Sequence, residues 1–192
     1  MTKAKELSEL ASAATVTSGN VALSGGLDVD GTTDLDVVDI DGAANFAADV
    51  TFANGADIIT ASAGTSNFRA GVNAGNSIAS GGNYNVTVGD EAGTAITTGS
   101  HNTLVGSLTG DALTDADSNV AIGYASLSTD TLGSRSIAIG HGALNEQNFT
   151  SATDTYNVAI GYAAGNVITT GIFNTLVGGL TGDALTEGTR NV

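Results

Sequence analysis

The chain contains no cysteine, no proline and no tryptophan, and it has only one methionine. Without cysteine, the sequence carries no information on the redox compartment in which the protein works. Proline has no N–H group to donate to a neighbouring strand, so its absence is compatible with a continuous β-ladder. The abundant residues agree with this, since the 27 glycines favour turns whereas Val, Ile and Thr favour strands. The composition therefore predicts an all-β protein of many short strands and turns.

Positive charge is also scarce, with five basic residues against 20 acidic ones and a formal net charge of −15. Such a chain repels phosphate groups, which argues against binding to nucleic acid or to an anionic membrane surface. No apolar run follows the first ten residues, and no stretch approaches the ~18 apolar residues of a membrane span. We therefore expect no secretory signal, no membrane insertion and synthesis in a cytosol.

A short motif repeats along the second part of the chain. The strings YNVTVG, HNTLVG, SNVAIG, RSIAIG, YNVAIG and FNTLVG end at Gly89, Gly106, Gly123, Gly140, Gly161 and Gly178. Their spacings are 17, 17, 17, 21 and 17 residues, so one repeat carries a four-residue insertion. On a longer scale, residues 84–120 match residues 156–192 at 24 of 37 positions. A fixed period of this kind predicts a solenoid in which each repeat forms one coil.

Each repeat contains a run with the two-residue period of a β-strand. In Val120-Ala121-Ile122 the alternation places the two branched side chains on one face, where we expect them to fill the coil interior. The small residue between them would then face outward and allow close packing there, although Leu104 and Leu176 occupy the same position. A second short run follows in each repeat, so we predict two strands and two turns per coil, with coils about 4.8 Å apart.

Glycine and asparagine recur at the two ends of this strand. Glycine closes it, where a side chain would obstruct the corner or φ is positive. Stacked asparagine amides can hydrogen-bond along a solenoid, so we interpret the asparagines as a structural ladder rather than a ligand site. The candidate structural residues are the six glycines named above and Asn85, Asn102, Asn119, Asn157, Asn174 and Asn191, with Ser136 at the equivalent position of the remaining coil.

These repeats, for example Ser136-Ile137-Ala138-Ile139-Gly140, resemble the head repeats of trimeric autotransporter adhesins, the YadA-like heads. The NTLVG and TTG variants look like a related repeat of phage tail fibres. The resemblance covers about residues 67–192. It implies a left-handed parallel β-roll and a homotrimer around a shared axis.

Residues 21–66 show a different pattern. Leu27-Asp28-Val29-Asp30-Gly31 recurs as Val38-Asp39-Ile40-Asp41-Gly42, and each run alternates apolar and acidic residues before an Asp-Gly turn. This segment is similar to the β-structured shafts of phage fibres. Alone it is too short to bury a stable core, which three chains wrapped together would provide. The runs lack the downstream glutamate of a calcium loop, so we interpret them as plain turns.

A short amphipathic helix is predicted within residues 1–20, because apolar side chains such as Leu7 and Leu10 fall at helical spacing. Such a helix is marginal alone in water, so it either bundles with its copies or docks on a partner. The resemblance to phage fibres makes this the virion-attachment end, with a tail or adaptor protein as partner. The candidate attachment residues are Lys3, Lys5, Leu7 and Leu10.

No catalytic constellation emerges from the sequence, so we expect no enzyme activity, no cofactor and no metal. His101 and His141 fall at repeat positions that also hold Phe or Tyr, which is typical of packing or surface positions. Carboxylates such as Asp111 and Asp183 recur in repeat turns rather than forming a unique pair. The most irregular place is the insertion around residues 146–149, where either an exposed Phe149 contacts a surface or the loop is simply tolerated.

The leading interpretation is a structural virion protein that forms a trimeric tail fibre, is assembled in the host cytoplasm and takes part in attachment to an unknown host receptor. The alternative is a bacterial surface trimeric adhesin, which requires a signal peptide and a membrane anchor. A glycan-cleaving tailspike is disfavoured because the chain shows no unrepeated polar cluster. Because Asn191-Val192 opens a further coil, the period predicts a glycine at about position 195 of a longer natural polypeptide.

Overall fold

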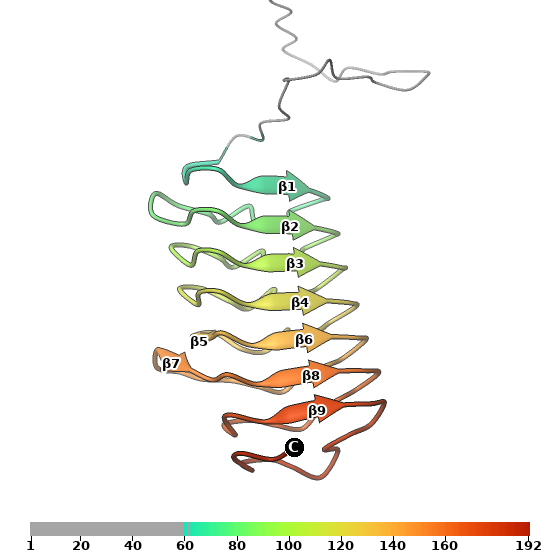
Figure 1. The fold of residues 1–192 in the computed structure, drawn as a ribbon. Coiled ribbons are helices and arrows are strands. Elements are labelled where there is room, and N and C mark those ends of the chain that lie inside the picture. Colours follow the sequence, from blue (N-terminus) through green and yellow to red (C-terminus); the bar gives the residue numbers. More distant parts are fainter. Residues whose placement is uncertain (1–59, 61) are drawn as a thin grey trace, which may run out of the picture. The chain divides into compact units, whose positions relative to one another are not determined.

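The computed structural model describes residues 60 and 62–192, which belong to one compact unit, Phe52–Val192. The helix expected in residues 1–20, with its four candidate attachment residues, lies outside the described residues. So does most of the shaft expected in residues 21–66. The described part is all-β, and its strands stack one above another as successive coils of a solenoid (Figure 1).

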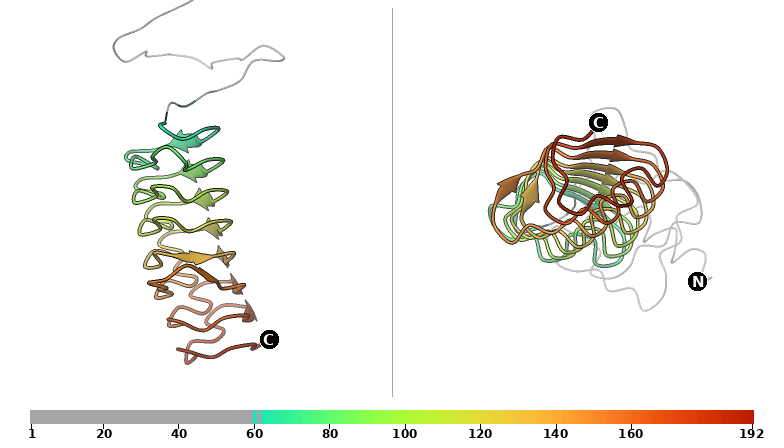
Figure 2. Two further views of the ribbon diagram at one scale, coloured as in Figure 1. Left: turned by 90° about the vertical axis from the view of Figure 1, so that its left-hand side faces the viewer. Right: turned by 90° about the horizontal axis from the view of Figure 1, so that it is seen from below.

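Seven strands form one parallel sheet in the order β1-β2-β3-β4-β6-β8-β9. Two further strands, β5 and β7, pair with each other at a different side of the coil, as the end-on view in Figure 2 shows. The strand bounds are Phe68–Ala70 (β1), Val86–Val88 (β2), Thr103–Val105 (β3), Val120–Ile122 (β4), Gly133–Ser134 (β5), Ile137–Ile139 (β6), Thr153–Asp154 (β7), Val158–Ile160 (β8) and Thr175–Val177 (β9).

The register of the main sheet follows the sequence repeat. Val86 pairs with Thr103, and Thr103 pairs with Val120, at the 17-residue spacing. Across the insertion, Ile137 pairs with Val158, so the four additional residues leave the sheet and do not shift the pairing. The prediction of a parallel β-solenoid with coils of about 17 residues is therefore confirmed.

The stack of coils begins before β1. The N–H of Thr65 donates to Oδ1 of Asn83 at 2.7 Å. Similar bonds from a backbone N–H to a side-chain oxygen join later coils, as from Ser100 to Asp117. The hydroxyl of Thr60 donates to the carbonyl of Asn67 at 2.8 Å and accepts the N–H of Arg69 at 3.1 Å. Because an unpaired strand edge exposes donors and acceptors, these bonds satisfy part of the first edge of the sheet.

The expectation of two strands per coil is wrong for most of the roll. Among the described residues, a second strand exists only as β5 and β7, beside the insertion. Elsewhere the second half of the coil contains left-handed residues, such as Leu108 with φ +56° and Leu127 with φ +53°. A strand needs φ near −120°, so these residues turn the chain instead of extending it.

From β2 onward, the two faces of the main-sheet strands are also the reverse of the expectation. The middle residue points into the coil, and Leu104, Ala121 and Ala138 have no exposed surface. The flanking residues Val120 and Ile122 do not fill the interior but lie on the outer side of the sheet, partly exposed. The small middle residue therefore makes room for the core and not for an external partner.

Leucine and isoleucine from the rest of the coil explain why the strand's middle residue can be small. A coil of 17 residues encloses a narrow interior, and one large side chain from the turn segment occupies most of it. The fully buried large side chains of this kind are Ile96, Leu113, Leu127, Leu144 and Ile168.

Candidate interaction surface

The asparagine positions form a buried ladder at the start of the main-sheet strands. Oδ1 of Asn102 accepts the backbone N–H of Asn119 at 3.0 Å, and Nδ2 of Asn102 donates to the carbonyl of Ala116 at 2.8 Å. Asn119 repeats the pattern one coil later, with bonds to the N–H of Ser136 and the carbonyl of Gly133. Each of these side-chain amides thus binds two backbone groups of the next coil, one at the start of its strand and one in the turn before that strand. The amides of Asn102 and Asn119 are buried.

The six coil-closing glycines lie at the other end of the strands, with φ between +127° and +140°. In five of them, all except Gly178, the backbone passes so close to the glycine of the next coil that a side chain would not fit. A Cβ built on Gly123 would lie 2.7 Å from the carbonyl carbon of Gly140 in the next coil. The predicted glycine and asparagine sites therefore fix the strand, and the strand presents its outer side chains to solvent.

These outward side chains form the outer face, which we define as the first and last residues of β2, β3, β4, β6, β8 and β9. It consists of Val86, Val88, Thr103, Val105, Val120, Ile122, Ile137, Ile139, Val158, Ile160, Thr175 and Val177. Ile122 and Ile160 are more than a third exposed, and Val177 is two-thirds exposed. The seven strands of this sheet contain no carboxylate, although the whole chain carries a net charge of −15.

Stacked aromatic rings border the outer face on both sides. Before the strands, Tyr84 stacks on His101 with ring centroids 5.0 Å apart, and further along the column Tyr156 stacks on Phe173 at 5.3 Å. These distances are close to the strand spacing of about 4.8 Å, because each ring occupies the same position in its own coil.

After the strands, a second column contains three rings in a row. The ring of His141 lies between Tyr124 and Tyr162, with centroid distances of 5.1 and 5.3 Å. Both histidines of the chain thus stand in ring columns, where an imidazole replaces a phenol or phenyl ring. Tyr124 and Tyr162 are more than half exposed, so the columns widen the apolar surface beyond the strands.

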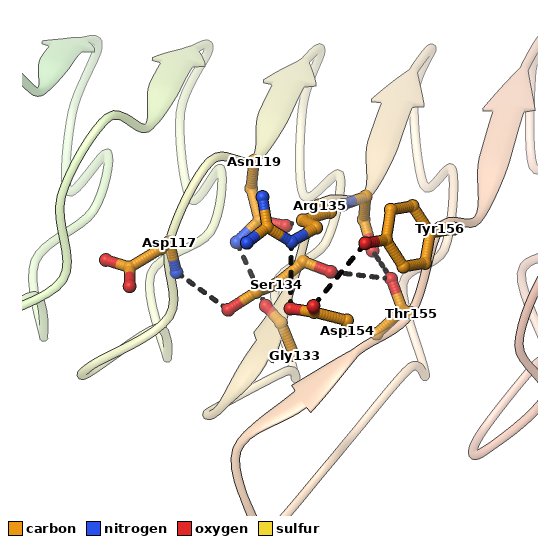
Figure 3. A network of polar contacts seen from close by, with 9 residues as sticks. Asp117, Asn119, Gly133, Ser134, Arg135, Asp154, Thr155 and Tyr156 are labelled. Carbon is orange, nitrogen blue, oxygen red and sulfur yellow. Dashed lines mark hydrogen bonds and ion pairs between the residues drawn. The ribbon is translucent and has the colours of Figure 1, made fainter.

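Arginine adds positive charge at the edge of the first ring column. The guanidinium of Arg135 lies 6.0 Å from the ring centroid of Tyr156, and that of Arg190 lies 5.3 Å from the ring of Phe173. Nε of Arg135 also pairs with Oδ1 of Asp154 at 2.9 Å, and this bond raises the pKa of Arg135 (Figure 3). Cations are therefore held beside aromatic rings at this border.

Residues 146–149, where the insertion was expected, lie against a polar network. The expectation of an exposed Phe149 is wrong, since its side chain is 8% exposed. Its backbone N–H donates to Oδ1 of Asp130, a buried carboxylate that also accepts the N–H of Gly133. Nearby, Thr155 bonds to the carbonyl of Ser134 in β5 (Figure 3). The bond from the N–H of Leu132 to the carbonyl of Phe149 keeps the 17-residue register, whereas the bond from the N–H of Thr153 to the carbonyl of Leu132 spans 21 residues. The four additional residues therefore follow Phe149, and residues 150–152 are exposed.

Two carboxylates in the turn segments have shifted pKa values. Burial raises the pKa of Asp111, and its Oδ1 has no hydrogen-bond partner. The hydroxyls of Thr98 and Thr97 donate to Asp115 and lower its pKa. Neither carboxylate belongs to a metal cluster, because no group of three or more His, Cys, Asp or Glu residues that could hold a metal ion lies within residues 60 and 62–192. In the same part of the chain, no helix is long and apolar enough to cross a membrane.

The arrangement presents an extended apolar strip with aromatic borders. Such a strip can bury area against another apolar surface. Sequence reasoning missed it because it assigned Val120 and Ile122 to the interior. The available signal was Leu104, whose large side chain at the middle position is incompatible with a close external contact.

No protein-family model, no curated protein and no solved structure matches the chain.

Proposed function

We propose that the chain is one protomer of a trimeric virion fibre, a phage tail fibre that takes part in host attachment. The observation that carries this proposal is the outer face, an apolar strip that runs over six successive coils without a carboxylate. Exposed strips of this kind mark surfaces at which proteins associate.

A further copy of the chain is the partner that fits this strip. Its side chains repeat at the coil spacing, so two copies that run parallel match each other at every coil. The strip itself carries no carboxylate, which avoids repulsion between like charges along it. In this arrangement each protomer buries Val and Ile side chains that are partly exposed in the single chain, at a gain of about 25 cal/mol per Å² of apolar surface.

The remaining parts of the proposal follow from the resemblance to adhesin heads and phage fibres. These parts are the number of three protomers, the left-handed course of the roll, the shaft in residues 21–66 and the attachment of residues 1–20 to a tail or adaptor protein. The fibre would be assembled in the host cytoplasm and would reach the host receptor in the virion. A stack of coils held together by backbone ladders is suited to a structural role.

Light scattering on the purified full chain tests the proposal. We expect a mass of three times the 18.8 kDa protomer at micromolar concentration. The substitution Ile139→Glu places a carboxylate at the centre of the outer face and should shift the mass towards that of one protomer. The matched control Ser77→Glu adds the same charge at an exposed turn residue and should leave the mass unchanged. A stable wild-type monomer under these conditions would contradict the proposal.

A further inference from the structure

One coil lacks the asparagine on which its neighbours depend. Ser136 occupies the ladder position, and its backbone N–H makes the usual connection, since it donates to Oδ1 of Asn119 at 2.8 Å. In the other direction the connection is lost, because the short hydroxyl of serine cannot reach the next rung as an amide does. Ser136 is nevertheless completely buried, and its hydroxyl lies 2.6 Å from the hydroxyl of Thr155.

The next rung shows which group replaces the missing amide. In regular coils, Nδ2 of one asparagine donates to Oδ1 of the preceding one, as from Asn102 to Asn85 at 3.1 Å and from Asn174 to Asn157 at 3.2 Å. Nδ2 of Asn157 makes the equivalent bond to Oε1 of Gln147 at 2.8 Å. Gln147 lies 17 residues after Asp130, at the turn-segment position that holds buried Leu or Ile in other coils, and it is itself completely buried.

The other end of the Gln147 amide completes the connection to the coil below. Its Nε2 donates to Oγ of Ser136 at 2.9 Å and to Oδ2 of Asp130 at 2.6 Å. Asp130 is held in turn by the backbone N–H groups of Gly133 and Phe149. All three polar connections of the Gln147 amide are therefore to buried groups, which is the condition for a stable polar network in a protein interior.

We propose that Gln147 is the missing rung of the asparagine ladder, supplied from the turn-segment position that holds a buried Leu or Ile in other coils. The amide is supplied from residue 147 instead of residue 136, and Asp130 positions it. Ser136 and Gln147 then form one device, because either of them alone would leave buried polar groups without partners. The device lies where residues 84–120 give way to their copy, residues 156–192, and it keeps the ladder continuous across that junction.

The sequence makes a direct measurement possible, because Gln147 is the only glutamine in the chain. Selective ¹⁵N labelling of glutamine in the full-length protein gives one side-chain NH₂ signal. We expect its hydrogen exchange to be at least about 100-fold slower than that of a free glutamine side chain, as for other groups that exchange only through opening of the structure. Exchange at the rate of a free side chain would overturn the proposal.

Variants separate a ladder rung from a merely buried side chain. Gln147→Leu keeps the approximate volume but removes the amide, so the side-chain NH₂ of Asn157 should exchange about tenfold faster or more. The NH₂ of Asn102, three coils away from Asn157, should keep its rate. The exposed neighbour provides the control, since Glu146→Leu should change neither rate.

Restoring the amide at the original position gives the decisive comparison. In the double variant Ser136→Asn/Gln147→Ala, we expect the exchange rate of the Asn157 side chain to return towards the wild-type value, relative to Gln147→Ala alone. This comparison remains valid if Gln147→Leu fails to fold. The proposal is overturned if Asn157 keeps its protection without the Gln147 amide, or if the asparagine at 136 brings no recovery.

Discussion

The coil-closing glycines can be tested at Gly123, where two separate physical effects oppose a side chain. The backbone of Gly123 has φ +127°, which lies outside the small left-handed region open to other residues. A Cβ at this position would also lie 2.7 Å from both the carbonyl carbon and the carbonyl oxygen of Gly140. Since these are backbone atoms of the next coil, they cannot move aside as the end of a flexible side chain can.

The expected cost of Gly123→Ala follows from these two effects. The strained dihedral costs about 1–3 kcal/mol, and the forced displacement of a packed backbone costs about another 1–3 kcal/mol. We therefore expect a destabilisation of about 2–6 kcal/mol, located at the coils that contain β4 and β6. Gly142→Ala is a matched control, because its φ is +65° and the nearest atom to its Cβ is Nδ2 of Asn166 at 3.4 Å. This control should cost only the left-handed strain of about 1–2 kcal/mol.

Native-state hydrogen exchange is the appropriate assay, because a stack of repeats does not unfold in a single two-state step. The N–H of Gly140 donates to the carbonyl of Ile122 at 2.8 Å and reports directly on the affected pair of coils. Its protection should fall by more than about tenfold in Gly123→Ala, since 1.4 kcal/mol corresponds to a factor of ten. Equal protection in the Gly123 and Gly142 variants would refute the argument from backbone contact.

Three other changes have defined outcomes. Burial raises the pKa of Asp111, so its ionised form destabilises the fold. Asp111→Asn should therefore raise the melting temperature at pH 7 and have little effect at pH 3, where the carboxyl is protonated. The control variant is Asp183→Asn, at the exposed aspartate of the matching LTGDALT segment. Asn102→Ala should cost about 2–4 kcal/mol, because it leaves the carbonyl of Ala116 and the N–H of Asn119 unsatisfied, and unchanged urea denaturation would show that the ladder is dispensable. Deletion of residues 1–20 should leave the number of protomers in the oligomer unchanged but abolish incorporation into virions. Normal incorporation would disprove the anchor assignment.

The sequence by itself determined the period, the parallel register and the positions of the glycines and asparagines. This was possible because a solenoid brings each residue next to its own equivalent in the neighbouring coil. Val86, Thr103 and Val120 are neighbours in the sheet for the same reason that they are equivalent in the repeat. In such a fold, long-range contacts are encoded at a fixed short distance along the chain.

Only the tertiary structure decided which face of the strand is inside. Alternation in Val120-Ala121-Ile122 allows either orientation, and the choice depends on how much of the narrow interior Leu127 and similar residues already fill. The same holds for residues 146–149, where Gln147 and Phe149 are buried although their segment reads as a polar loop. The Gln147 amide is placed by bonds to Ser136 and Asp130, which lie far from it in the sequence. A period predicts what neighbouring coils share, whereas the filling of a coil depends on the volumes and hydrogen-bonding groups that all its segments bring together.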